Sequence, residues 1–308
     1  RKADRRKRSR KRKEHSMTVV DKVDLKLKET NAPADALRTF SKGMNVELGE
    51  EIIYEGEKYK AAKAMTNIQT EPNKDIANFA HMGAINEKAM FDRYIGTQTK
   101  KKDGRPLKFK IDTGKKRVNC FSFFNVDGSE IFIRKAGAVI AHKRLLNAGS
   151  RSWWEYFFEF GQDYKKDVVL YTDKYFGEFE IEITPNRLGA NLGHFSAGQR
   201  VLLGFTELEA EFGVNDYSRK QKTAYGDVFI AKGRTANYMS LAVVLPTPQI
   251  DRTRDTLKNL CGELTTFIGD EKDKGFKSLL VFGFLNDFRI KITGEQYSSL
   301  SINVEGII

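Results

Sequence analysis

Cysteine, histidine and tryptophan are scarce in this chain of 308 residues. The two cysteines, Cys120 and Cys261, lack the paired spacing of a zinc site or a disulfide framework. The four histidines stand in four separate contexts, and no two have the i, i+4 spacing of a zinc-binding helix. The sequence therefore predicts two buried, reduced thiols, no metal centre and no cofactor.

Long apolar runs and common catalytic signatures are also lacking. No hydrophobic stretch approaches the roughly 18 residues that a membrane helix needs, and no apolar segment follows the basic start. The glycine-dotted segment 186–193 lacks the lysine and the spacing of a phosphate-binding loop, and there is no Gly-x-Ser-x-Gly elbow. These absences favour a protein that is not an enzyme, has no catalytic residue and is not inserted in a membrane.

Positive charge is concentrated at the start of the chain. The net charge is +12, and residues 1–15 contribute +8 of it, from ten basic and two acidic residues. We expect residues 1–16 to be a disordered basic arm that binds either nucleic acid, through counterion release, or an acidic patch of a neighbouring protein. The predicted binding residues are Arg1, Lys2, Arg5, Arg6, Lys7, Arg8, Arg10, Lys11, Arg12 and Lys13.

The remaining chain has the pattern of a mainly β protein, built from antiparallel β-sandwich domains with one helix in the C-terminal domain. Residues 178–183 alternate strictly between Glu and apolar residues, which predicts a strand with one wet face. The Glu55–Gly56 pair predicts a hairpin turn within residues 45–62. Residues 64–84 and 215–222 are expected to be loops, and a helix is expected from Asp251 to Leu264.

These patterns divide the chain into four predicted parts. After the arm, residues 17–97 form a small β module, with a hairpin similar to chitin-binding-type modules, and a linker. Residues 98–213 form a β-sandwich domain, and residues 214–308 form a C-terminal α+β tail-assembly domain.

Several blocks, in order and spacing, resemble a family of tail-module structural proteins of tailed bacteriophages, encoded near tail-fibre genes. The blocks are residues 55–61, 85–92, 96–99, 153–158, 167–170, 216–220, 281–284, 287–288 and 299–306. The resemblance implies a multi-copy virion protein of the tail or adsorption apparatus, which links the tail body to fibres or receptor-binding parts. It also implies synthesis in the host cytoplasm, and as partners a second copy of this chain and other tail proteins.

Two further groups of residues are candidate sites. Tyr54, Tyr59, Trp153 and Trp154 are aromatic rings that either stack on a host surface glycan or pack in the core or in a subunit interface. The polar segment that contains Asp216, Tyr217, Arg219 and Lys220 is either a subunit-docking loop or a solvated one. Two alternative functions therefore stay open: a nucleic-acid-binding coat protein that uses the arm, and a glycan-binding or glycan-cleaving adsorption module.

Overall fold

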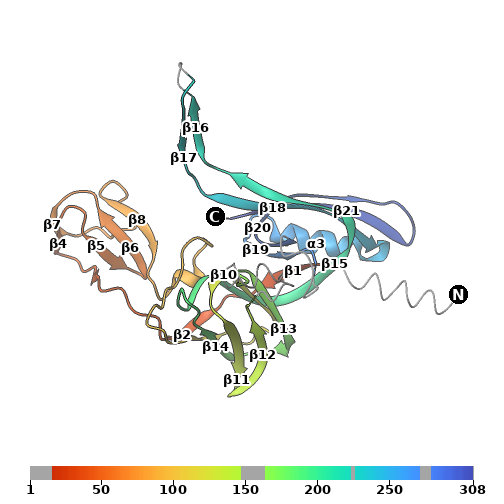
Figure 1. Cartoon of the computed structure of the whole chain (residues 1–308), viewed down its shortest axis with the longest axis horizontal. Helices are drawn as coiled ribbons and strands as arrows, with labels where there is room; N and C mark the ends of the chain where they lie inside the picture. Colours follow the sequence, from red (N-terminus) through yellow and green to blue (C-terminus); the bar gives the residue numbers. More distant parts are fainter. Residues whose placement is uncertain (1–15, 147–163, 223–225, 271–278, 308) are drawn as a thin grey trace, which may run out of the picture.

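The structure is a computed structural model that describes residues 16–146, 164–222, 226–270 and 279–307. Within these ranges the chain is mainly β and has one α-helix, α3 (Ile250–Leu260). Two short 3-10 helices are η1 (Ala89–Phe91) and η2 (Thr247–Gln249). The mainly β class and the single helix predicted from the sequence are confirmed (Figure 1).

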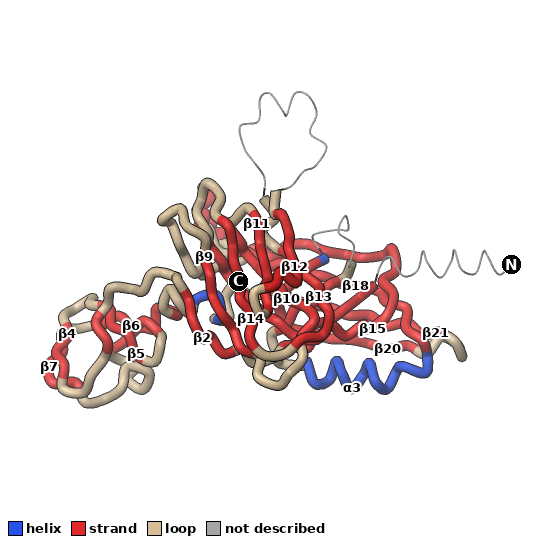
Figure 2. The backbone as a smooth tube through the Cα atoms, turned by 90° about the horizontal axis from the view of Figure 1, so that it is seen from below, coloured by secondary structure: helices blue, strands red, loops and turns tan. Residues whose placement is uncertain are grey.

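A closed barrel of six antiparallel strands forms one half of the body. The order around the barrel is β1, β19, β20, β21, β18 and β15, and β15 pairs with β1 to close it. Met17, Leu241 and Phe267 fill the interior, and α3 adds Leu257 and Leu260 to the same apolar cluster. Figure 2 shows α3 running along one side of the strands. The strands are β1 (Ser16–Lys22), β15 (Asn191–Asp216), β18 (Thr235–Pro246), β19 (Thr265–Ile268), β20 (Leu280–Lys291) and β21 (Tyr297–Gly306).

A β-sandwich forms the other half, and it shares the long strand β15 with the barrel. The first part of β15 pairs with β10 (Val118–Asp127), which pairs with β13 (Val168–Tyr175). The facing sheet has the order β12, β11, β14, β9, β2. Aromatic rings fill the space between the sheets, with Phe121, Phe123, Phe179 and Phe195 all buried. The facing strands are β2 (Lys26–Thr30), β9 (Leu107–Asp112), β11 (Glu130–Lys135), β12 (Ala138–Arg144) and β14 (Glu178–Thr184).

A small β module is inserted between β2 and β9, which are neighbours in the sandwich. The predicted hairpin is present in it, with Glu55 and Gly56 at its turn, both in the left-handed region. Residues 64–84, expected to be a loop, contain two strands, β7 and β8, because their side chains complete the core of the module. The strands are β3 (Arg38–Thr39), β4 (Met44–Val46), β5 (Glu51–Tyr54), β6 (Glu57–Ala61), β7 (Met65–Ile68) and β8 (Phe79–Ala84).

A two-stranded ribbon projects from the barrel, as Figure 1 shows. It continues the pairing of β15 with β18, and its outer part consists of β16 (Arg219–Lys222) and β17 (Val228–Ala231). Residues 215–222, expected to be a loop, are therefore largely strand, because pairing with β18 and β17 holds them extended.

Two of the sequence-based boundaries need correction. The predicted boundary after residue 213 falls within β15, so it does not separate two bodies. The helix ends at Leu260 rather than at Leu264, because Cys261 is extended and Gly262 turns the backbone into the left-handed region. Cys261 is consequently exposed, whereas Cys120 is buried as predicted.

Candidate functional site

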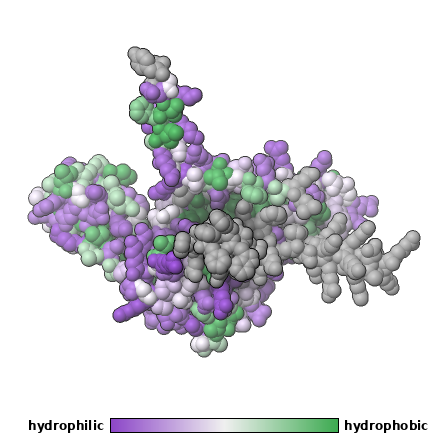
Figure 3. Space-filling view, viewed as in Figure 1, coloured by the Kyte–Doolittle hydropathy of each residue, from purple (hydrophilic) through white to green (hydrophobic). Residues whose placement is uncertain are grey.

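The outer ribbon, defined here as β16 and β17, exposes every one of its side chains. β17 is nevertheless apolar, and Phe229 and Ile230 are 66% and 63% exposed. Figure 3 shows these hydrophobic atoms gathered on the projecting ribbon. Exposed apolar side chains that cluster on one element mark an interaction surface.

The other strand of the outer ribbon is basic. In the antiparallel register Lys220 faces Ile230 and Lys222 faces Val228. Paired residues lie on the same face of a sheet, so an apolar side chain adjoins a basic one on this face of the ribbon. The outer ribbon therefore offers both apolar contact area and positive charge to a partner.

The predicted docking residues lie where the ribbon leaves the barrel. Asp216 accepts a hydrogen bond from the backbone N–H of Ser218 at 2.9 Å, and its carboxylate lies 3.1 Å from the Lys220 ammonium. Hydrogen bonds from Ser218 and Lys220 lower the pKa of Asp216 to about 2. Arg219 lies in β16, with its side chain exposed. Asp216 is thus used within the chain, whereas Arg219 is open to a partner.

Tyr217 anchors the ribbon to the barrel. Its hydroxyl donates a hydrogen bond of 2.6 Å to Glu305 on β21, and this bond lowers the pKa of Glu305 and raises that of Tyr217. The backbone of Gly233 passes so close that an added Cβ would lie 2.4 Å from the carbonyl oxygen of Tyr217. The ribbon is therefore held at a defined place on the barrel.

Sequence reasoning missed the apolar residues of β17. The signal in the sequence was the apolar run Val228–Phe229–Ile230, which follows closely after the basic segment 219–222. The same run predicts a strand over residues 227–230, whereas its place outside the body depends on the fold.

The candidate glycan-binding aromatics divide into two groups. Tyr59 is buried in the core of the inserted module, and Tyr54 packs edge-on against Phe40 with ring centroids 5.5 Å apart. The ring of Tyr59 is therefore not open to a sugar. Trp153 and Trp154 lie outside the described residues, as do the basic residues 1–15.

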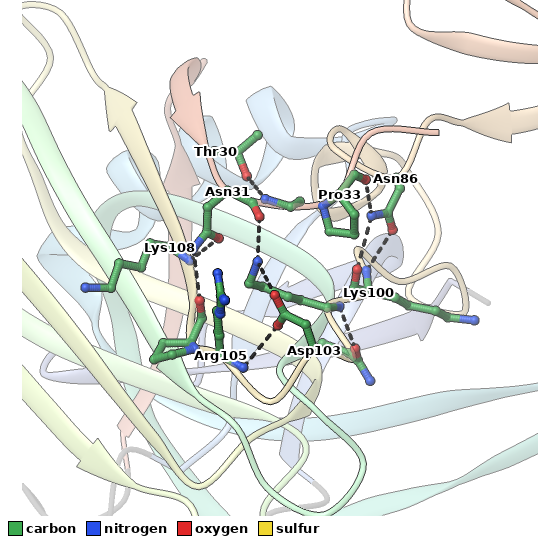
Figure 4. A network of polar contacts seen from close by, with 12 residues as sticks. Thr30, Asn31, Pro33, Asn86, Lys100, Asp103, Arg105 and Lys108 are labelled. Atoms are coloured by element: carbon green, nitrogen blue, oxygen red, sulfur yellow. Dashed lines mark hydrogen bonds and ion pairs between the residues drawn. The ribbon is translucent and has the colours of Figure 1, made fainter. Parts of the chain in front are cut away.

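A polar network fixes the inserted module to the sandwich, as Figure 4 shows. The side chain of Asn86 donates to the carbonyl oxygen of Pro33 and accepts from the backbone N–H of Lys100, each at 2.8 Å. Asn31, which follows β2, makes a similar link to β9, because its amide oxygen accepts a hydrogen bond from the backbone N–H of Lys108.

Lys101 is the buried cation of this network, with 7% of its surface exposed. Its ammonium donates to the carbonyl oxygen of Asn31 at 2.8 Å and lies 3.2 Å from the carboxylate of Asp103. The sequence pattern of the basic segment 96–117 predicts either a solvated hairpin tip or a contact for polyanions. The structure instead places its residues in this network and in β9, which pairs with β2 and β14. Lys101 is therefore structural, not a surface for polyanions.

The described ranges contain neither a cluster of metal ligands nor a helix that could span a membrane. No group of three or more His, Cys, Asp or Glu residues there is placed to hold a metal ion. No helix in the described part is both long and apolar enough to span a membrane.

Comparisons with protein-family models, with curated proteins and with solved structures found no match for this chain.

Proposed function

We propose that this chain is a structural subunit of a bacteriophage tail, which assembles in multiple copies and links the tail body to fibres or receptor-binding parts. The observation that carries the proposal is the outer ribbon. A two-stranded ribbon without a covering layer is marginally stable in water, and its unpaired edges invite pairing with another chain. An apolar strand in such a ribbon is favourable only where a partner covers it.

The exposed apolar residues of the barrel favour a second copy of this chain as the partner of the outer ribbon. The barrel exposes apolar side chains at the turn between β20 and β21, where Ile292 and Tyr297 are 70% and 42% exposed. Tyr297 pairs with Pro246, at the opposite end of β18 from the ribbon. At about 3.3 Å per residue, the twelve residues of β18 separate this turn from the base of the ribbon by about 36 Å along the strand.

Two different apolar patches at opposite ends of one body favour head-to-tail contacts. Such heterologous contacts close into rings when the rotation between copies permits it, and otherwise extend into filaments. Rings and stacked rings are the kind of assembly that a multi-copy tail subunit needs. In this proposal the basic arm is an electrostatic tether to an acidic surface of a neighbouring tail protein.

The test is the mass of the purified full chain, measured by multi-angle light scattering with absorbance at 260 and 280 nm. We expect a defined oligomer without nucleic acid, and rings or tubes in negative-stain electron microscopy. The double variant Phe229→Asp, Ile230→Asp should be a monomer, because burying two carboxylates at an interface costs several kcal/mol. The matched control is Leu188→Asp, which changes an equally exposed apolar residue in a sandwich loop.

Two results would contradict the proposal. A wild-type chain that stays monomeric at high concentration would leave the ribbon without the role assigned to it. Co-purifying nucleic acid that is released at high salt would favour the coat-protein alternative and make the basic arm the functional site.

A further inference from the structure

A small cavity of about 170 Å³ lies where the barrel, the sandwich and the base of the ribbon meet. The sandwich contributes Asn125 and Asp167 to its wall, and the ribbon base contributes Thr235 and Asn237. Gly96, in the loop that follows η1, completes this side. The proposed function does not use this cavity.

Hydrogen bonds fix Asn125 and Asp167, two residues that line the cavity. The backbone N–H of Asn125 donates to Asp167 Oδ1 at 2.9 Å, and its side-chain Nδ2 donates to the carbonyl oxygen of Ile95 at 2.9 Å. Asn125 has a left-handed backbone (φ of 51°), which asparagine tolerates better than most residues. The residue is thus held in an unusual conformation at the wall of the cavity.

One side-chain oxygen of each of these two lining residues accepts no hydrogen bond from the described part of the chain. Among the described residues, none donates a hydrogen bond to Asp167 Oδ2 or to Asn125 Oδ1, and none forms an ion pair with Asp167. Partial burial removes water from the Asp167 carboxylate, and the N–H of Asn125 and the positive charge of Lys166 offset this loss only in part. In agreement, burial raises the pKa of the Asp167 carboxyl group.

The unused oxygens define the chemistry of a ligand. A ligand that satisfies both must donate several hydrogen bonds and carry positive charge, and guanidinium does this with five donors in a planar fork that matches a carboxylate. The cavity is similar in volume to the roughly 150 Å³ cavity that holds benzene, so it has room for such a group.

We propose that this cavity binds a guanidinium group, held by the carboxylate of Asp167 and the amide oxygen of Asn125. The group belongs either to an arginine side chain of a basic peptide, such as residues 1–15 of another copy, or to a free small molecule. The chemistry of recognition is the same for both sources.

The experiment is isothermal titration calorimetry of the full chain with methylguanidinium chloride at millimolar concentration. Methylurea, which has a similar shape and no charge, is the control ligand. Asp167→Asn preserves the acceptor for the N–H of Asn125 and removes the charge. The matched control variant is Asp173→Asn in β13, the strand that follows Asp167, where the residue is exposed.

We expect saturable binding of methylguanidinium to the wild type and to Asp173→Asn, no binding of methylurea, and affinity about tenfold or more weaker in Asp167→Asn. Equal binding of methylurea, unchanged affinity in Asp167→Asn, or no saturable heat with the wild type would overturn the proposal. The wild-type comparison of the two ligands does not depend on how well the variants fold. A peptide of residues 1–15 that competes with methylguanidinium identifies an arginine side chain of this segment as the source, and one that does not compete excludes this segment.

Discussion

Acidification should destabilise the fold through one buried histidine, His194 on β15. Its ring is stacked on Phe282 with centroids 3.9 Å apart, and its Nδ1–H donates to the carbonyl oxygen of Asp92 at 2.8 Å. Burial lowers the pKa of His194 from 6.5 to about 4, against the opposing effect of this hydrogen bond. The imidazole is therefore neutral in the folded protein at pH 5, where it is protonated in the unfolded chain.

The size of the effect follows from the two pKa values. Because the unfolded chain binds the proton more tightly, stability is complete above pH 6.5 and falls as the pH drops towards 4. With 1.36 kcal/mol for each pKa unit, the full loss is about 3 kcal/mol, of which about 2.5 kcal/mol is reached at pH 4.5. Burial raises the pKa of Asp167 and of Asp92, and raised carboxyl pKa values oppose this loss when the pH falls further.

The measurement is the free energy of unfolding in urea at pH 7.5, 6.5, 5.5 and 4.5, followed by intrinsic fluorescence. His194→Gln retains a hydrogen-bond donor and cannot be protonated, so its stability should change by about 2.5 kcal/mol less than that of the wild type between pH 7.5 and pH 4.5. His81→Gln, which changes an exposed histidine on β8, is the control. A pH dependence that is identical in the wild type and in His194→Gln would refute the reasoning.

Three further predictions concern the ribbon, the network and the module. Gly233→Ala should cost about 1–3 kcal/mol in the ribbon alone, because its Cβ meets the carbonyl oxygen of Tyr217; faster proteolysis of the ribbon with an unchanged barrel melting temperature would show this. Lys101→Met should lower global stability by about 1–3 kcal/mol in thermal unfolding, whereas Lys102→Met, at an exposed position, should not; equal effects would contradict the structural role. Tyr59→Ala should cost the inserted module about 3–5 kcal/mol, seen as faster hydrogen exchange of its amides, and protection that stays unchanged would exclude a core role.

Local patterns predicted local structure well. The alternation in residues 178–183 gives a strand whose apolar side chains Phe179, Ile181 and Ile183 are buried, while the three glutamates face outward. The polar pair Asn286–Asp287 interrupts an apolar run and predicts a break in the strand, and the pairing of β20 with β21 has a register shift between Leu285 and Asp287. In both cases the signal comes from neighbours in sequence, so the residues themselves are sufficient to specify it.

The candidate sites were predicted less well because the burial and the neighbours of their residues depend on distant parts of the chain. Tyr59 lies in a hairpin like a binding aromatic, yet the structure buries it with Val46, Ile52 and Phe79 in the core of the module. Asp167 and Asn125 carry no motif, and only the meeting of the ribbon base with the sandwich places both at one cavity. The apolar run of β17 was visible in the sequence, but its exposure was not.

Residue patterns alone predict the β class, the single helix, the main strands and the concentration of positive charge at the start of the chain. Three features depend on the folded chain: β1 closes a barrel with β15 and β19, a module is inserted between two adjacent strands, and β16 and β17 leave the body. The physical reason is that strand pairing joins residues far apart in the chain, such as Val19 with Phe267. A strand's own residues specify its faces, but its partners are decided by the packing of the whole chain.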